Sequence, residues 1–170
     1  MTDARSALVV TVSNRASAGV YADDSGPVVA EGLRGMGFAV DGPLVVPDGD
    51  PVEEALRDAV AAGYDAVVTN GGTGLSPLDL TPERTRRVLD YEVPGVPEAI
   101  RAAGAAKGVP TAVLSRGLAG VAGRTFVVNL PGSPGAARDG VQVLAGFLLH
   151  AVEQLHGVDH RRTAHGGGNP

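Results

Sequence analysis

Two aspartates of this sequence occupy positions where carboxylates could hold a metal ion. Asp48 ends a predicted strand, and Asp79 lies on the loop that follows another one. The carboxyl ends of parallel strands meet at one edge of a sheet, so both acids are expected at that edge. Mg²⁺ prefers carboxylates together with substrate phosphates, which makes the pair a candidate magnesium site. Each acid could instead cap a neighbouring helix, and Asp79 taken alone fits either role equally well.

Three glycine-rich segments follow predicted strands and therefore belong to the same edge of the sheet. They span residues 13–26, 70–74 and 131–134. Glycine allows backbone N–H groups to approach an anion without a side chain in the way, and helix N-termini add partial positive charge. The segment 70–74 (Asn-Gly-Gly-Thr-Gly) lacks the spacing of a dinucleotide-binding fingerprint and could be only a tight turn. Its proximity to Asp79 favours a phosphate cradle.

Two arginines at predicted strand ends could bind a phosphate or a carboxylate through paired hydrogen bonds. Arg15 follows the first predicted strand, and Arg116 follows a strand predicted at 110–114. Both could equally be surface residues. Catalysis by a Ser-His-Asp group has little support. Only His150 lies inside the predicted fold, in an apolar helix where a packed histidine is the simpler interpretation.

The composition excludes several functional classes. The 170 residues fit one domain, and a hydrophobic fraction of 44% provides enough apolar material for a core. A net charge of −5 and an aromatic content of only 4% argue against a nucleic-acid partner. The chain has no cysteine, which excludes disulfides, thiolate nucleophiles and cysteine-bound metals. Its single lysine, Lys107, leaves phosphate chemistry to backbone amides, arginine and a metal.

The chain is expected to be a cytoplasmic protein without a membrane segment. Residues 143–152 form the longest apolar run, which is too short to span a bilayer and contains a histidine. Residues 1–5 lead into only six apolar-rich residues, so no secretory leader is predicted.

Predicted strands and helices alternate, which indicates an α/β fold with a mostly parallel sheet covered on both faces. The predicted strands span residues 7–12, 38–46, 65–69, 110–114 and 124–130. The predicted helices begin near residues 27, 50, 81, 96 and 133, with Asp50 and Thr81 as caps, and the last helix continues to about residue 155. We predict a single domain over residues 1–155. The polar, Gly-rich segment 156–170 is predicted to be a disordered tail with solvated histidines.

A set of short motifs runs through the chain at residues 12–21, 24–27, 46–48, 70–74, 79–83, 93–95, 114–116, 119–120 and 129–134. Together and in this order they resemble the MogA/MoaB family of molybdenum cofactor biosynthesis proteins, which includes the G domain of gephyrin. The resemblance covers about residues 7–155. Each motif alone is weak, whereas the whole set in the family's order is highly specific.

The resemblance implies a three-layer α/β/α sandwich of the molybdopterin-binding domain fold that assembles as a homotrimer. It also implies adenylyl transfer with Mg²⁺ as cofactor, in which the terminal phosphate of molybdopterin attacks the α-phosphorus of ATP and pyrophosphate leaves. A molybdenum-insertion protein of the MoeA type then uses the adenylylated pterin. Two alternatives stay open: a non-catalytic, MoaB-type pterin-binding or assembly protein of the same pathway, and a nucleotide-binding module with another acceptor.

The resemblance further implies roles for individual residues. Asp48 and Asp79 are the implied catalytic acids, with Asp79 organising Mg²⁺ and phosphates and Asp48 near the nucleotide or pterin. Family members often carry Asp in place of Asn14, for which we prefer a structural capping role. The implied substrate- and nucleotide-binding residues are Ser13, Arg15 and Ser17 in the first loop, Gly71, Gly72, Thr73 and Gly74 in the phosphate cradle, Ser115 at the pterin with Arg116 beside it, and Pro131, Gly132 and Ser133 at the nucleotide end.

Overall fold

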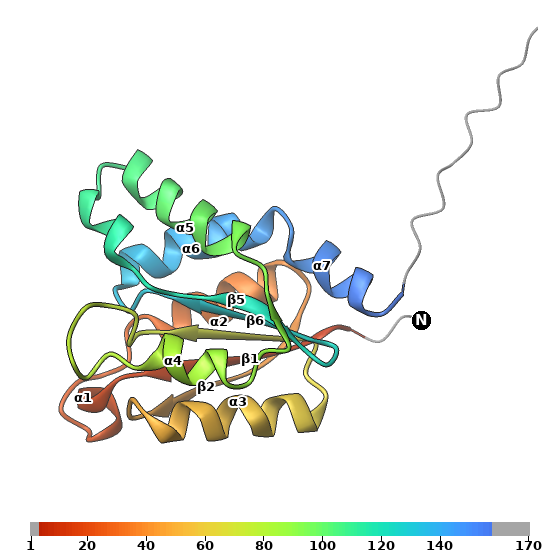
Figure 1. Ribbon diagram of the computed structural model, residues 1–170, viewed down its shortest axis with the longest axis horizontal. Coiled ribbons are helices and arrows are strands. Elements are labelled where there is room, and N and C mark those ends of the chain that lie inside the picture. The colour runs from red at the N-terminus through yellow and green to blue at the C-terminus, as the bar shows by residue number, and fades with distance from the viewer. Residues whose placement is uncertain (1–3, 158–170) are drawn as a thin grey trace, which may run out of the picture.

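The computed structural model describes residues 4–157 and contains one six-stranded sheet between two layers of helices (Figure 1). This arrangement confirms the predicted three-layer α/β/α fold. The strands are β1 (Ser6–Val12), β2 (Ala39–Val46), β3 (Ala66–Asn70), β4 (Tyr91–Glu92), β5 (Ala119–Ala122) and β6 (Thr125–Leu130). The helices are α1 (Asn14–Ser17), α2 (Gly26–Gly35), α3 (Asp50–Ala62), α4 (Thr81–Arg86), α5 (Gly95–Ala106), α6 (Pro134–Ala145), α7 (Leu148–Leu155) and a 3₁₀ helix, η1 (Pro110–Leu114).

Four parallel strands form one side of the sheet, in the order β2-β1-β3-β6, with β2 at the edge. Every residue of β3 and β6 is buried, as expected for parallel strands that are covered on both faces. Their Val- and Thr-rich sequences fit a pleated, buried surface. In register, Thr11 of β1 pairs with Asn70 of β3, which pairs with Leu130 of β6. The loops that follow these three strands therefore start side by side.

The two layers of helices bury separate apolar clusters against the sheet. Helices α2, α5, α6 and α7 cover one face, where Leu33 and Leu144 pack with Val68. Helix α3 covers the other face, where Leu56 packs with Val67. Each of these fully buried side chains contributes about 1.5–3 kcal/mol relative to exposure. This burial fixes the central strands and hence the loops at their carboxyl ends.

The far edge of the sheet departs from the sequence prediction. The predicted strand at 110–114 is wrong, because these residues form η1 and pack on α5 instead of pairing in the sheet. Pro110 has no N–H for a strand ladder, and Ala112 fits closely against Gly104 of α5. The strand in this region is β5, whose Ala-Gly-Val-Ala sequence has little β propensity of its own. Strands β4 and β5 run antiparallel, so the sheet is only mostly parallel.

Two predicted helix caps are also wrong. The N-cap of α3 is Gly49, at a φ of 98°, and Asp50 lies in the first turn. Its carboxylate instead pairs with Arg84 of α4 at 2.8 Å. The N-cap of α4 is Leu80, so Thr81 is the first helical residue and caps nothing. A tertiary ion pair thus uses the Asp50 side chain, whereas the buried hydroxyl of Thr81 has no hydrogen-bond partner among the described residues.

The last predicted helix is divided into α6 and α7. The chain leaves the helix at Gly146, a residue that weakens helices because of its backbone freedom. Ser133 is confirmed as the start of α6, since its hydroxyl accepts a hydrogen bond from the N–H of Ala136 at 3.2 Å.

The described chain continues past α7, where the ring of His156 lies 2.5 Å from a carboxylate oxygen of Asp65. The predicted tail falls almost entirely outside residues 4–157, so it stays a prediction, as does the domain boundary. No helix in the described part of the chain is both long enough and apolar enough to cross a bilayer.

A buried amide side chain connects several elements beneath the loops through hydrogen bonds. Asn129 of β6 is 2% exposed, and its Nδ2 donates to the hydroxyls of Thr69 and Thr85 at 2.9 and 3.0 Å. Its Oδ1 accepts from the N–H of Leu118 at 3.0 Å. One side chain thus joins β6 to β3, to α4 and to the segment before β5.

Replacing Asn129 with Ala should lower the free energy of unfolding by about 2–5 kcal/mol, because three buried polar groups lose their partner. Urea-induced unfolding measures the loss. Thr85→Val removes only one of the three bonds and should cost less. An Asn129 variant as stable as the parent chain would contradict this account of the network.

Candidate active site

Two of the predicted glycine-rich segments lie against one another at the carboxyl edge of the sheet. The N–H of Gly71 donates to the carbonyl of Leu130 at 3.0 Å. Gly132 is so close to Gly71 that a Cβ on Gly132 would lie 3.1 Å from the Gly71 Cα. Only backbones without side chains can approach in this way. The loop after β3 and the turn before α6 therefore form one continuous surface.

Gly71 and Gly72 must be glycines for two separate reasons. Their φ angles are 102° and 68°, in the left-handed region that L-residues with side chains rarely adopt. A Cβ on Gly71 would also overlap the carbonyl oxygen of Val12. A Cβ on Gly72 would overlap Oδ2 of Asp48 and the hydroxyl of Thr81. The loop thus packs directly on the end of β1 and on the Asp48 carboxylate.

Asp48 lies behind Gly72 and is held by backbone N–H groups. Its Oδ1 accepts from Gly49 at 2.7 Å, and both of its oxygens accept from Leu80 at 3.2 Å. Burial nevertheless raises the pKa of Asp48, and the nearby negative charges of Asp79 and Glu83 raise it further against the lowering effect of these hydrogen bonds. The carboxylate therefore sits in a negative environment that a cation would relieve.

Asp79 reaches the same loop from the other side. Its Oδ2 accepts from the N–H of Ser76 at 3.1 Å and would lie 2.8 Å from a Cβ on Gly74. In residues 4–157 no three acidic or histidine side chains gather as a metal site. Two carboxylates in mutual repulsion fit Mg²⁺, which takes one or two protein carboxylates together with substrate phosphates. Asp79 and Asp48 are the residues that would hold it.

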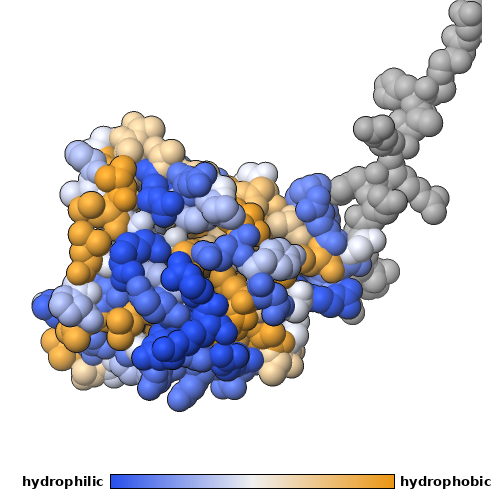
Figure 2. All heavy atoms as spheres, viewed as in Figure 1, coloured by the Kyte–Doolittle hydropathy of each residue, from blue (hydrophilic) through white to orange (hydrophobic). Residues whose placement is uncertain are grey.

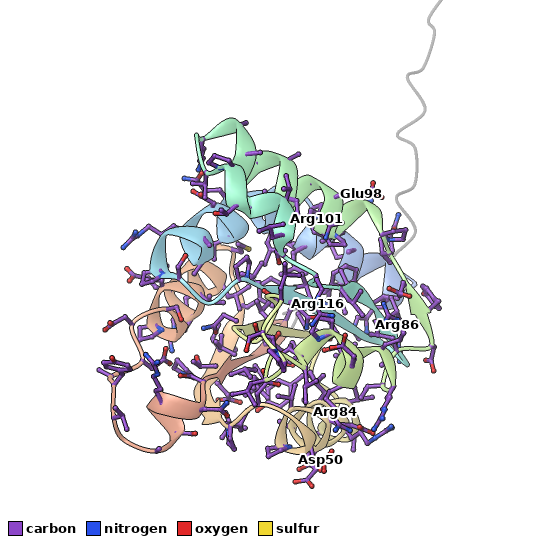
Figure 3. All side chains as sticks on the ribbon, turned by 60° about the vertical axis from the view of Figure 1, so that its left-hand side comes forward. Asp50, Arg84, Arg86, Glu98, Arg101 and Arg116 are labelled. Atoms are coloured by element: carbon purple, nitrogen blue, oxygen red, sulfur yellow. The ribbon has the colours of Figure 1, made fainter. Side chains whose placement is uncertain are left out.

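Arg116 (Figure 3) holds the 74–79 loop through hydrogen bonds to its backbone. Its Nε donates to the carbonyl of Gly74 and one terminal nitrogen donates to the carbonyl of Asp79, both at 2.8 Å. The other terminal nitrogen pairs with the Glu83 carboxylate, which lowers the pKa of Glu83 and raises that of Arg116. All three guanidinium nitrogens therefore donate to the protein. Arg116 lines neither cavity described below, so its predicted contact with ligand is not supported by this geometry.

Two cavities open at this surface and share Gly72 and Gly132. The larger has a volume of about 680 Å³, a size typical of ligand sites, and the smaller about 350 Å³. Helices α5 and α6 and the 3₁₀ helix η1 form the outer wall of the larger cavity. Apolar surface gathers over η1 beside the hydrophilic surface of α4 (Figure 2). The smaller cavity lies between the first loop and the start of α2.

Most of the predicted site residues line these two cavities. The larger cavity is lined by Gly72, Thr73, Gly74, Asp79, Ser115, Pro131, Gly132 and Ser133, and the smaller by Ser13, Gly71, Gly72 and Gly132. The hydroxyls of Ser115 and Thr73 lie 3.2 Å apart, which joins two of the predicted motifs.

The first loop contributes less than predicted. Arg15 and Ser17 lie on α1 and line neither cavity. The guanidinium of Arg15 lies over the ring of Tyr21, 5.4 Å from its centroid, and Tyr21 does line the smaller cavity. The predicted capping role of Asn14 is wrong, because Ser13 is the N-cap of α1. The Asn14 Oδ1 instead accepts a hydrogen bond from the N–H of Asp48 at 2.9 Å.

Sequence reasoning missed several charged residues of the larger cavity, namely Arg101, Lys107, Arg138 and Asp139. Arg138 and Asp139 follow closely on the predicted 131–134 turn, and this position could have indicated them. No local pattern could have indicated Lys107, because it reaches the cavity only through the packing of α5 against α6. Asp23 and Asp24, which line the smaller cavity, fall within a loop that was recognised only as a whole.

A match to a family model identifies the protein family of this chain. A family model described as a probable molybdopterin binding domain matches residues 8–150. The chain belongs to this molybdopterin-binding domain family. The match covers the glycine-rich loop, Asp79 and the turn before α6, which line the cavities, and it also covers Asp48, which lines neither of them.

Two curated relatives of this molybdopterin-binding domain differ in length. A molybdenum cofactor biosynthesis bifunctional protein of Chlorobaculum tepidum is 40% identical over 154 residues, which cover 89% of this chain and 49% of that protein. A molybdopterin adenylyltransferase of Helicobacter pylori (strain J99) is 35% identical over 155 residues, which cover 88% of this chain and 86% of that protein. The chain thus spans about half the length of the first relative and most of the second.

Solved structures show the same molybdopterin-binding domain fold. A structure of MogA is 60% identical, with a TM-score of 0.86, over 89% of this chain and 99% of that one. MoaB of Thermus thermophilus is 43% identical, with a TM-score of 0.83, over 90% of this chain and 97% of that one. These likenesses confirm the resemblance to MogA and MoaB that the motifs predict.

Gly72→Ala should destabilise the fold by about 2–4 kcal/mol, because it combines a strained φ with overlap of Asp48 and Thr81. Thermal or urea-induced unfolding measures the effect. Gly135→Ala is the matched control, since a Cβ there meets nothing within 4 Å and φ is not positive. An alanine at 72 that is tolerated as well as the one at 135 would show that the loop is not fixed as described.

Proposed function

We propose that this chain is a molybdopterin adenylyltransferase of molybdenum cofactor biosynthesis. The observation that carries the proposal is the meeting of two cavities at Gly72 and Gly132. Adenylyl transfer needs two substrates whose phosphates touch, and a shared wall of glycines lets both approach one backbone. The Helicobacter pylori relative, named for this activity, supports the same conclusion.

In the proposed reaction the terminal phosphate of molybdopterin attacks the α-phosphorus of ATP. A bond forms between a molybdopterin phosphate oxygen and the α-phosphorus, the bond to the β-phosphate breaks, and pyrophosphate leaves. Displacement between two anions needs positioning and charge neutralisation more than covalent help. The backbone N–H groups of 71–74 and the start of α6 would supply fixed positive dipoles beside the reacting phosphates.

The two aspartates complete the proposed site. Asp79 lines the larger cavity and Asp48 lies behind Gly72, so together they would hold Mg²⁺ on the loop. When bound, the ion would offset the charge of the substrate phosphates. Arg116 has a positioning role in this proposal, because it holds the carbonyls on either side of the 75–78 segment.

We assign molybdopterin to the larger cavity and the nucleotide to the smaller one. The larger cavity has an apolar wall that includes Ile100, Val109 and Leu114, which suits the faces of a flat heterocycle. The smaller cavity is lined by Tyr21, a residue that is 59% exposed and whose ring could stack on adenine. The 131–134 turn borders both cavities, but of the three residues predicted at the nucleotide end only Gly132 lines the smaller one, while Pro131 and Ser133 line the larger.

A non-catalytic, MoaB-type role is the alternative, because MoaB of Thermus thermophilus has the same fold. Pterin binding without product formation would favour it. A homotrimer, a molybdenum-insertion partner of the MoeA type and a cytoplasmic location also stay proposals. Sedimentation of the pure chain tests the first of these three.

Incubation of the pure chain with molybdopterin, ATP and Mg²⁺ tests the proposed function. We expect adenylylated molybdopterin and pyrophosphate in equal amounts, and no product when Mg²⁺ is removed by a chelator. Absence of product under conditions where a known adenylyltransferase of the family is active would overturn the proposal.

Asp79→Asn should lower kcat at least about 100-fold, since it removes a charge that organises the phosphates while preserving volume. Product formation measures kcat, and circular dichroism and size exclusion should show an unchanged fold and assembly state. Asp58→Asn, on the exposed surface of α3, is the matched control and should keep full activity. Equal activity in the Asp79 variant would remove this residue from the mechanism.

A further inference from the structure

One charged cluster of the larger cavity has no part in the proposed reaction. Lys107, the only lysine of the chain, and Asp139 both line this cavity. The ammonium of Lys107 donates to Oδ1 of Asp139 at 2.7 Å and also to Oε1 of Gln142. Lys107 ends α5 and Asp139 lies on α6, so the packing of these helices, which run side by side in Figure 1, creates the cluster.

Both members of this pair keep hydrogen-bonding capacity. The ammonium of Lys107 has three protons and gives two of them to Asp139 and Gln142. Oδ2 of Asp139 accepts no hydrogen bond from any residue of 4–157. The side chains are 45% and 21% exposed, and an ion pair of this exposure adds little stability. The pair thus presents a carboxylate acceptor and an ammonium donor, side by side, to the cavity.

The 2-amino-4-oxopyrimidine ring of a pterin carries the complementary pattern. Its exocyclic amino group and adjacent ring N–H point in the same direction and can bind one carboxylate through two parallel hydrogen bonds. The neighbouring 4-carbonyl accepts a hydrogen bond, which an ammonium can supply. Adenine lacks this pattern, since its amino group lies next to a ring nitrogen that accepts and does not donate.

We infer that Asp139, with Lys107 beside it, recognises the 2-amino-4-oxo edge of the pterin and makes the larger cavity selective for this heterocycle. The inference rests on the proposed function, because it takes molybdopterin as the occupant of this cavity. The apolar residues of the same cavity contact the ring faces, and the phosphate end of the ligand lies toward 72–74. Asp139 is thereby a specificity-determining residue, separate from the acids at the phosphates.

Fluorescence titration of the full chain with two free heterocycles tests the inference. Pterin has the 2-amino group, whereas lumazine has a second carbonyl in its place, which would point an acceptor at the Asp139 carboxylate. The parent chain should bind pterin about tenfold more tightly than lumazine, since a carbonyl that faces a carboxylate loses two charge-assisted hydrogen bonds. Asp139→Asn should remove the preference, because an amide can donate to a carbonyl as well as accept.

Two further variants separate recognition from structure. Lys107→Met should weaken pterin and lumazine by similar factors, since both ligands keep the 4-carbonyl. Asp58→Asn, remote on α3, should retain the full preference. ATP binding should be unchanged in all three variants, and urea-induced unfolding should show that they remain folded.

Several results would overturn the inference. These are equal affinity of the parent chain for pterin and lumazine, no detectable pterin binding at millimolar concentration, or a preference that survives Asp139→Asn. Tighter binding of GMP than of pterin would also overturn it, because guanine shares the same edge and would then be the recognised base. A parent chain that shows no pterin preference and still forms adenylylated molybdopterin would refute this inference alone. Intact preference without product would refute the proposed function alone.

Discussion

The whole site depends on the close packing of two adjacent glycines. Both have positive φ angles; a Cβ on Gly71 would overlap the carbonyl of Val12 at the end of β1, and a Cβ on Gly72 would overlap Asp48 and Thr81. This packing brings the loop after β3 against the turn before α6, so that the ends of three parallel strands form one surface. Arg116 holds the other side of the loop through two backbone carbonyls. The two cavities meet where this packing places the glycine backbone.

The proposed site would bind phosphate mainly without lysine. In a chain with one lysine and a net charge of −5, backbone N–H groups, helix starts and a metal would supply most of the positive charge for anion binding. The Asp48 and Asp79 carboxylates repel one another near the loop, and this repulsion contributes, after burial, to the raised pKa of Asp48. The repulsion destabilises the pair of carboxylates when no cation is present. The pair therefore favours a cation that binds together with the substrate phosphates. In these proposals, residues of the loop neutralise the charge of the phosphates, and different residues, on α5 and α6, recognise the pterin.

The sequence predicted the loops better than the elements around them. Glycine spacing at 70–74 and a capping serine at 133 are local signals, so the edge of the sheet that carries the two cavities could be located without a structure. The strand predicted at 110–114 failed because packing on α5 outweighs the β propensity of that segment. Arg116 was assigned to a ligand because its contacts with the loop carbonyls are tertiary. Lys107 was missed as a cavity residue for the same reason, since only the packing of α5 and α6 brings it beside Asp139.

A crystal structure of the chain with molybdopterin and α,β-methylene-ATP tests the central claim, that two substrates occupy two cavities and meet at their shared glycines. The methylene group prevents loss of pyrophosphate, so both substrates should be trapped together. The account predicts the pterin in the larger cavity, the adenosine in the smaller one, and the α-phosphorus beside Gly72 and Gly132. Nucleotide and pterin that exclude one another from a single cavity, or phosphates bound away from 71–74, would contradict it.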